Sequence, residues 1–169
     1  LNGHPHTGVD IFGRVGTPVV SQTGGLVIYA KEMQEKKISF SPNAAREIKV
    51  LTDAIDCCVA LDAPIATVHL SSGPNPPMIN DIGRGRYTNL VEYAAKRGIK
   101  IAFENQSNLF NLAWALEEFK DAENVGFCWD DGHQECATPN IEMMALFGER
   151  LICTHIQDNY AVYIEDPHM

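Results

Sequence analysis

The chain has 169 residues, of which 45% are hydrophobic and 21% are charged, as is typical of one soluble globular domain. Its formal net charge is −9, from 22 acidic and 13 basic residues, and the basic residues form no run. This balance disfavours nucleic acid as a partner, because such binding depends on Lys and Arg at phosphates. No apolar run approaches the roughly 20 residues of a membrane span, and the N-terminus lacks a signal-peptide pattern.

The first 40 residues predict little regular structure. Residues 1–25 are rich in Gly, Pro, Thr and His and indicate a long loop, and residues 26–36 predict a short helix. A loop of this length in a compact domain is usually functional or mobile. His4 and His6 in this loop are therefore candidate site residues, with solvated loop histidines as the alternative. We expect one domain over residues 1–169, in which residues 41–169 form βα units.

An amphipathic helix is predicted from Ser41-Pro42 to about Leu61. Ser and Pro suit the N-cap and first helical positions, and Pro64 ends the pattern. Apolar residues recur at steps of three and four along this segment, as on one face of a helix: Ala44, Ile48, Leu51, Ile55 and Cys58.

Four short apolar runs of strand type follow, at 65–70, 99–104, 125–130 and 151–155. Helical patterns separate them, at 87–97, from about Leu109 to Asp121, and at 140–148. This alternation predicts a parallel sheet with right-handed crossovers. The sequence has neither GxGxxG nor a Walker-type glycine loop, so it lacks the fingerprints of the phosphate-cradling nucleotide folds.

Each predicted strand ends in a side chain that can bind metal: His69, Glu104, Asp130 and His155. The last three are 26 and 25 residues apart, about the length of one βα unit, so they return to the same rim of the sheet. Converging carboxylates and imidazoles suit Zn²⁺, Mn²⁺, Co²⁺ or Mg²⁺. A buried carboxylate there must be paired or metal-bound, because an isolated buried charge is too costly.

These residues also have purely structural alternatives. Glu104 could form a salt bridge with a Lys or Arg of the rim, and Asp130 could cap a helix. His69 and His155 could be satisfied core histidines. Four further candidates fall just beyond the strand ends, the last two close to the chain terminus: His133, Asp158, Asp166 and His168.

The chain has five cysteines, an odd number, and no CxxC motif. We interpret them as buried free thiols of a protein in the reducing cytoplasm: Cys57, Cys58, Cys128, Cys136 and Cys153.

Four ordered motifs resemble the xylose-isomerase-like TIM-barrel superfamily. They are Ile101-Ala-Phe-Glu104-Asn105, Trp129-Asp130-Asp-Gly-His133, Thr154-His155-Ile-Gln-Asp158-Asn159 and Asp166-Pro-His168. The superfamily holds sugar-phosphate isomerases and epimerases and the endonuclease IV type of DNA-repair enzyme. The resemblance runs from about Ser41 to the C-terminus. It implies an α/β fold, a (β/α)8 TIM barrel, of which this chain covers about strands three or four to seven.

The resemblance implies a metal-dependent isomerase or epimerase that moves a proton through an enediolate of a sugar or sugar phosphate. Glu104, Asp130 and His155 would bind one divalent cation (Mn, Zn, Co or Mg), Glu104 would also be the catalytic base, and His133 a second catalytic residue. The remaining matches imply contacts with substrate or a second metal for His69, Asp166 and His168, and with substrate for Asp158. His6, from the N-terminal loop, is a further candidate for substrate binding.

Two other functions stay open. One is an endonuclease IV-like nuclease with a multi-zinc site, which the positions of the histidines fit but the acidic charge opposes. The other is a non-catalytic barrel that binds a sugar or a partner protein. In the superfamily a further carboxylate ligand comes from an eighth strand, expected beyond Met169. We therefore expect this polypeptide to be inactive alone, and an open sheet edge would favour a homo-oligomer.

Overall fold

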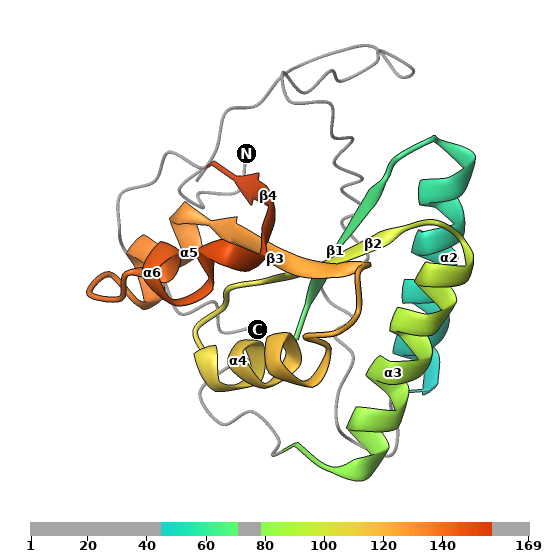
Figure 1. Ribbon diagram of the computed structural model, residues 1–169, viewed down its shortest axis with the longest axis horizontal. Coiled ribbons are helices and arrows are strands. Elements are labelled where there is room, and N and C mark those ends of the chain that lie inside the picture. Colours follow the sequence, from blue (N-terminus) through green and yellow to red (C-terminus); the bar gives the residue numbers. More distant parts are fainter. Residues whose placement is uncertain (1–44, 71–78, 157–169) are drawn as a thin grey trace, which may run out of the picture.

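The computed structural model describes residues 45–70 and 79–156, with side chains from Ile48 onward (Figure 1). Four parallel strands form one sheet in the order β1-β2-β3-β4. They are β1 (Ile65–His69), β2 (Lys100–Glu104), β3 (Val125–Asp130) and β4 (Leu151–His155). Because each strand pairs with the next one along the chain, the order never reverses as it does in a doubly wound sheet. The arrangement is that of consecutive units of a (β/α) barrel, as predicted.

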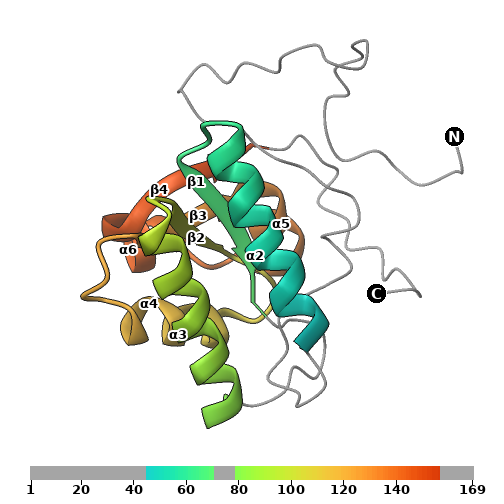
Figure 2. The ribbon, with the colours of Figure 1, turned by 90° about the vertical axis from the view of Figure 1, so that its right-hand side faces the viewer.

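Helices connect the strands and supply the rest of the described fold. They are α2 (Ala45–Ala60), α3 (Asp81–Lys96), α4 (Leu109–Glu118), α5 (Asp131–Ala137), α6 (Met143–Phe147) and the 3₁₀ turn η1 (Gly148–Arg150). Figures 1 and 2 show α2 and α3 side by side along the same part of the sheet. The predicted loop at 1–25 and helix at 26–36 lie outside the described residues, and the single domain stays a prediction.

The hydrophobic core lies between the helices and one face of the sheet. Strand residues Val68, Phe103 and Phe127 are buried there against helix residues such as Ile55 and Leu90. The predicted apolar stripe of α2 is confirmed over its described part, because Leu51, Ile55 and Cys58 are buried and Ile48 is packed against them. We call this the helix-facing side of the sheet, and the opposite side its inner face.

A β-bulge in β4 sets which residues reach the inner face. Phe127 pairs with Leu151, whereas the next residue, Cys128, pairs with Cys153, so Ile152 is an extra residue. Leu151 packs against the core, and strict alternation would turn Cys153 and His155 toward the helices as well. The bulge reverses the phase, and both residues face inward. His155 then reaches the carboxylate at the end of β2.

Several predicted helix bounds were wrong. Helix α3 begins at Asp81 rather than near residue 87, because Asn80 caps it by accepting a hydrogen bond from the Gly83 amide (2.9 Å). The glycines of its first turns lower helix propensity and concealed this start. Helix α4 ends at Glu118, the segment predicted at 140–148 divides into α6 and η1, and α5 was not predicted.

The five cysteines form no disulfide, as predicted. Their predicted burial is right for Cys58 and Cys128 and wrong for Cys57, which is exposed; the other two are half-buried. Among the described residues, no helix combines the length and apolar character that crossing a membrane requires. The cytoplasmic location stays a prediction.

We predict that Gly126→Ala destabilises the protein. A Cβ atom at Gly126 would lie 2.6–2.7 Å from three side-chain atoms of Ile152, including both branches of this stiff residue. Overpacking of this kind costs about 1–3 kcal/mol, to be measured by urea denaturation. Gly85→Ala in α3 is the matched control, because nothing lies within 4 Å of its added Cβ. It should raise stability by up to about 1 kcal/mol. Equal stability of the two variants would contradict the close approach of β3 and β4.

Candidate metal centre

The strand ends bring the predicted ligands together at one edge of the sheet. His69 on β1 pairs in register with Glu104 on β2, and Asp130 on β3 pairs with His155 on β4. His133 joins them from the first turn of α5. The edge is formed by the carboxyl ends of the strands, where the active sites of (β/α) barrels lie.

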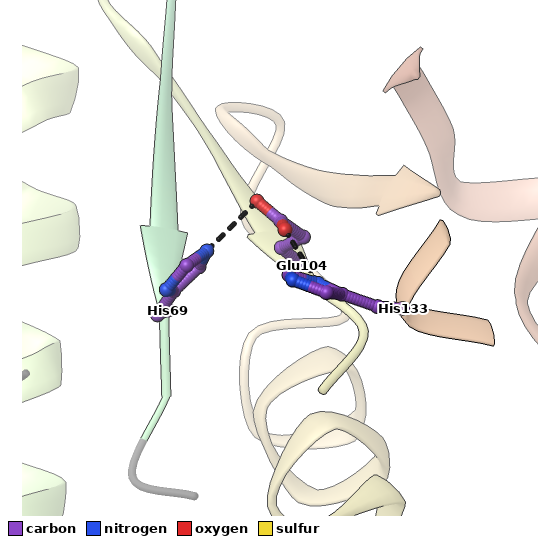
Figure 3. A group of neighbouring side chains, drawn as sticks. All are labelled: His69, Glu104 and His133. Carbon is purple, nitrogen blue, oxygen red and sulfur yellow. Dashed lines mark ion pairs between the residues drawn. The ribbon is translucent and has the colours of Figure 1, made fainter. Parts of the chain in front are cut away.

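Glu104 is the centre of this cluster, and Figure 3 shows its carboxylate between His69 and His133. The residue is only 2% exposed. Its Oε1 lies 2.9 Å from Nδ1 of His133. Its Oε2 lies 3.1 Å from Nε2 of His69 and 3.2 Å from Nδ1 of His155. Three imidazoles from three elements therefore surround one buried carboxylate, where the sequence alternative was a Lys or Arg.

Asp130 is fully buried and uses its two oxygens differently. Oδ1 caps α5 by accepting a hydrogen bond from the backbone amide of His133 at 2.7 Å. Oδ2 lies 3.6 Å from Nδ1 of His155 and 3.7 Å from Nδ1 of His133. The helix-cap alternative is thus correct, and it leaves the second oxygen facing the imidazoles.

Asn105 holds Asp130 in place, a role that the sequence reasoning missed. Its buried side chain donates to the carbonyl oxygen of Asp130 at 2.8 Å and accepts from the amide of Asp130 at 2.7 Å. The amide group thus continues the hydrogen bonding of β2 and β3 by one further step. A polar Asn directly after an apolar strand was the available signal, because such a side chain must find buried partners.

His133 is positioned by the end of β2. Besides Glu104, its Nδ1 lies 3.0 Å from the carbonyl oxygen of Asn105 and 3.0 Å from the side-chain amide nitrogen of Gln106. Its ring also contacts His69 edge-on, with centroids 5.8 Å apart. These contacts hold the imidazole against the carboxylate rather than letting it turn to solvent.

The cluster shifts the pKa values of its members in opposite directions. Burial alone would raise the pKa of Glu104, but the imidazoles of His133, His155 and His69 beside its carboxylate hold it well below its usual range. The carboxylates of Asp130 and then Glu104 raise the pKa of His155 to about 10. For His133, burial acts to lower the pKa, and the nearby carboxylates raise it overall. Without a cation, protons on His133 and His155 thus compensate the buried carboxylate.

A divalent cation fits this arrangement. Oε2 of Glu104 is buried without a hydrogen-bond partner among the described residues, although two ring nitrogens lie within 3.2 Å. Two ring nitrogens that surround a carboxylate oxygen without a hydrogen bond to it are suited to bind one cation together with that oxygen. The described residues offer two sets whose donor atoms all lie within 4.8 Å of one another: His69, Glu104 and His133, and Glu104, Cys128 and His155. Oδ2 of Asp130 lies beside the second set.

The other candidates fall outside the described residues. They are His4, His6, Asp158, Asp166 and His168. Their contacts with substrate or a second metal stay predictions.

A singly wound parallel sheet with carboxylates and imidazoles at its carboxyl edge defines the class of barrel proteins with a metal-competent site. Residues 31–167 match the family model described as xylose isomerase-like TIM barrel, and the chain belongs to this family. The four strands are therefore consecutive strands of a TIM barrel.

Three similar proteins illustrate the relationship. D-allulose 3-epimerase from Methylomonas sp., solved with D-allulose, is 20% identical with a TM-score of 0.57, over 72% of this chain and 48% of that chain. The TTHB071 protein from Thermus thermophilus, soaked with ZnCl₂, is 21% identical with a TM-score of 0.59, over 75% of this chain and 54% of that chain. Uncharacterized protein y4fM from Sinorhizobium fredii is 26% identical over 159 residues, 86% of this chain and 50% of that protein. The chain thus spans about half the length of these proteins.

We predict that Asn105→Ala destabilises the protein by about 2–4 kcal/mol, because it leaves two buried backbone groups of Asp130 without partners. Urea denaturation measures this loss. Asn124→Ala is the matched control, since it removes a single hydrogen bond, to the Val91 carbonyl, at the opposite end of the sheet. A loss at Asn105 no larger than that at Asn124 would contradict the bridging role.

Proposed function

We propose that this chain carries the metal-binding part of a sugar or sugar-phosphate isomerase or epimerase. Glu104, Asp130 and His155 would hold one divalent cation, with Mn²⁺, Zn²⁺, Co²⁺ and Mg²⁺ as candidates. The observation that carries the proposal is Oε2 of Glu104, buried between two imidazoles at the carboxyl edge of the barrel strands and without a hydrogen bond among the described residues. Membership of the family and a fold shared with a D-allulose 3-epimerase support the sugar class.

The ligand atoms follow from the contacts of each side chain. Nδ1 of His155 lies within 3.6 Å of both Oε2 of Glu104 and Oδ2 of Asp130, so these three atoms face one another. Asp130 binds through one oxygen only, because the other caps α5. A bound cation would supply Lewis-acid stabilisation for the negative charge that builds on the oxygens of an open-chain sugar when it loses a carbon-bound proton.

The residues of the chain would carry the proton transfer. Glu104 is kept ionised by its imidazole partners and accepts the proton from the carbon beside the carbonyl group. His133, whose side chain is 36% exposed, is placed to hydrogen bond a sugar oxygen while its Nδ1 stays on Glu104. Return of the proton to the neighbouring carbon gives isomerisation. Epimerisation requires that a proton is returned to the original carbon from the opposite face of the sugar, which needs a second acid.

One observation favours a second candidate, the endonuclease IV-like nuclease. His69, Glu104 and His133 form a second donor set that shares Glu104 with the first, so the edge could hold more than one Zn²⁺. The net charge of −9 opposes binding to a phosphate backbone, and we therefore rank this function second. The non-catalytic barrel is the third reading, and an absence of metal binding with the fold retained would favour it.

Metal content tests the centre. We expect about one Mn, Co or Zn per chain by elemental analysis after dialysis, and its loss in Glu104→Gln, which keeps the side-chain size but removes the charge. Glu118→Gln is the control and should retain the metal, because Glu118 on α4 forms a partly exposed ion pair with Arg84 on α3. Two or three Zn per chain would favour the nuclease, and a metal-free wild-type protein would contradict both enzymatic proposals.

Proton exchange tests the chemistry. We expect no complete turnover from this polypeptide alone, but proton exchange requires only one base. With metal added, the protein should therefore exchange the carbon-bound proton beside the carbonyl of a ketose or ketose phosphate for deuterium in D₂O, followed by NMR. Removing the base in Glu104→Gln should slow the exchange by about 10²–10⁴-fold. A metal-loaded wild-type protein that exchanges no proton but cleaves abasic duplex DNA would replace the isomerase with the nuclease.

A further inference from the structure

Two thiols lie in the same row of the sheet as the catalytic carboxylate. Glu104 on β2 pairs in register with Cys128 on β3, and Cys128 pairs with Cys153 on β4. Side chains of paired residues in a parallel sheet point to the same face. The row at the inner face therefore reads His69, Glu104, Cys128 and Cys153, with Asp130 and His155 one step closer to the carboxyl edge.

Cys128 is close enough to share an ion with its neighbours. Its Sγ, a carboxylate oxygen of Glu104 and a ring nitrogen of His155 all lie within 4.8 Å of one another. Around tetrahedral Zn²⁺, with bonds of about 2.0–2.3 Å, donor atoms lie roughly 3.3–3.8 Å apart. Movements of about 1 Å would therefore bring the three atoms to bonding distance.

The surroundings of Cys128 differ from those of an ordinary core thiol. Cys58 is the internal comparison, because it is buried within the apolar cluster between α2 and the sheet. Cys128 is fully buried but does not belong to that cluster, in which β3 is represented by Val125 and Phe127. Its neighbours on the inner face are the Glu104 carboxylate and Cys153, whose Sγ lies 3.8 Å from the hydroxyl of Thr67. The thiol thus lies beside groups that bind ions.

We propose that Cys128 is a ligand of the ion held by Glu104 and His155, and that the centre therefore takes a thiophilic cation, Zn²⁺ or Co²⁺, in preference to Mn²⁺ or Mg²⁺. The inference rests on the proposed function, because it concerns the same ion. Binding breaks the S–H bond, forms a metal–sulfur bond and releases the proton to solvent, so no oxidant is required. Thiolate ligands favour Zn²⁺, whereas sites of oxygen ligands suit Mn²⁺ and Mg²⁺.

Cobalt spectroscopy of the full chain tests this inference. Titration with Co²⁺ should give a near-ultraviolet thiolate-to-cobalt charge-transfer band beside the visible bands of the ion. Cys128→Ser should lose the charge-transfer band and keep visible cobalt bands through Glu104 and His155. Cys57→Ser is the control. Cys57 is an exposed thiol on α2, so this variant should keep both sets of bands.

The outcomes separate this inference from the proposed function. Visible cobalt bands without charge transfer in the wild-type protein would overturn the thiolate ligand and leave the oxygen and nitrogen site standing. Loss of the band in Cys153→Ser but not in Cys128→Ser would overturn the assignment to Cys128. No bound cobalt at all would overturn both proposals. If Cys128→Ser fails to fold, X-ray absorption of the zinc-loaded wild-type protein decides, by a sulfur neighbour at about 2.3 Å or its absence.

Discussion

The burial of the Glu104 carboxylate is the constraint on which the rest of the site depends. A buried carboxylate requires compensation, and here it comes from imidazoles on β1, β4 and α5 within 3.2 Å. An imidazole can compensate in two ways, as a protonated hydrogen-bond donor or as a neutral metal ligand. Under the proposed function, protons and a cation would therefore compete for one place, and the fold would be supported in either state. A Lys or Arg partner would support the first state alone.

Two backbone devices bring the partners to Glu104. The bulge at Ile152 turns Cys153 and His155 toward the inner face, and Asn105 fixes the end of β3 by a pair of buried hydrogen bonds. Asn105 acts at the carboxyl end of β3, whereas the bulge lies near the start of β4 and sets the direction of the residues that follow it. Bulges commonly re-aim side chains beside functional sites, and a buried amide with both groups satisfied rigidifies its surroundings.

The sequence predicted the strands well because each is an apolar run with a charged or imidazole side chain at its end. The convergence of Glu104, Asp130 and His155 followed from the length of a βα unit, and that of His69 from its place at the end of a parallel strand. The bulge was not predictable in this way, because alternation along Leu151–His155 gives no sign of an extra residue. The neighbour of Glu104 on β3 was not predictable either. Register decides that it is Cys128, and register depends on the packing of whole strands.

The prediction of Asp130 as a metal ligand and its alternative as a helix cap are compatible, because its two carboxylate oxygens have different neighbours. One oxygen accepts from the first turn of α5, so the carboxylate is held by the helix that also carries His133. The second oxygen is consequently fixed in direction toward His155. A ligand oriented by a second bond loses little conformational freedom when a cation binds, which strengthens the interaction without adding a contact. The short helix α5, which was not predicted, thus contributes to the site in two ways. It carries His133, and its N-terminus orients the capping residue Asp130.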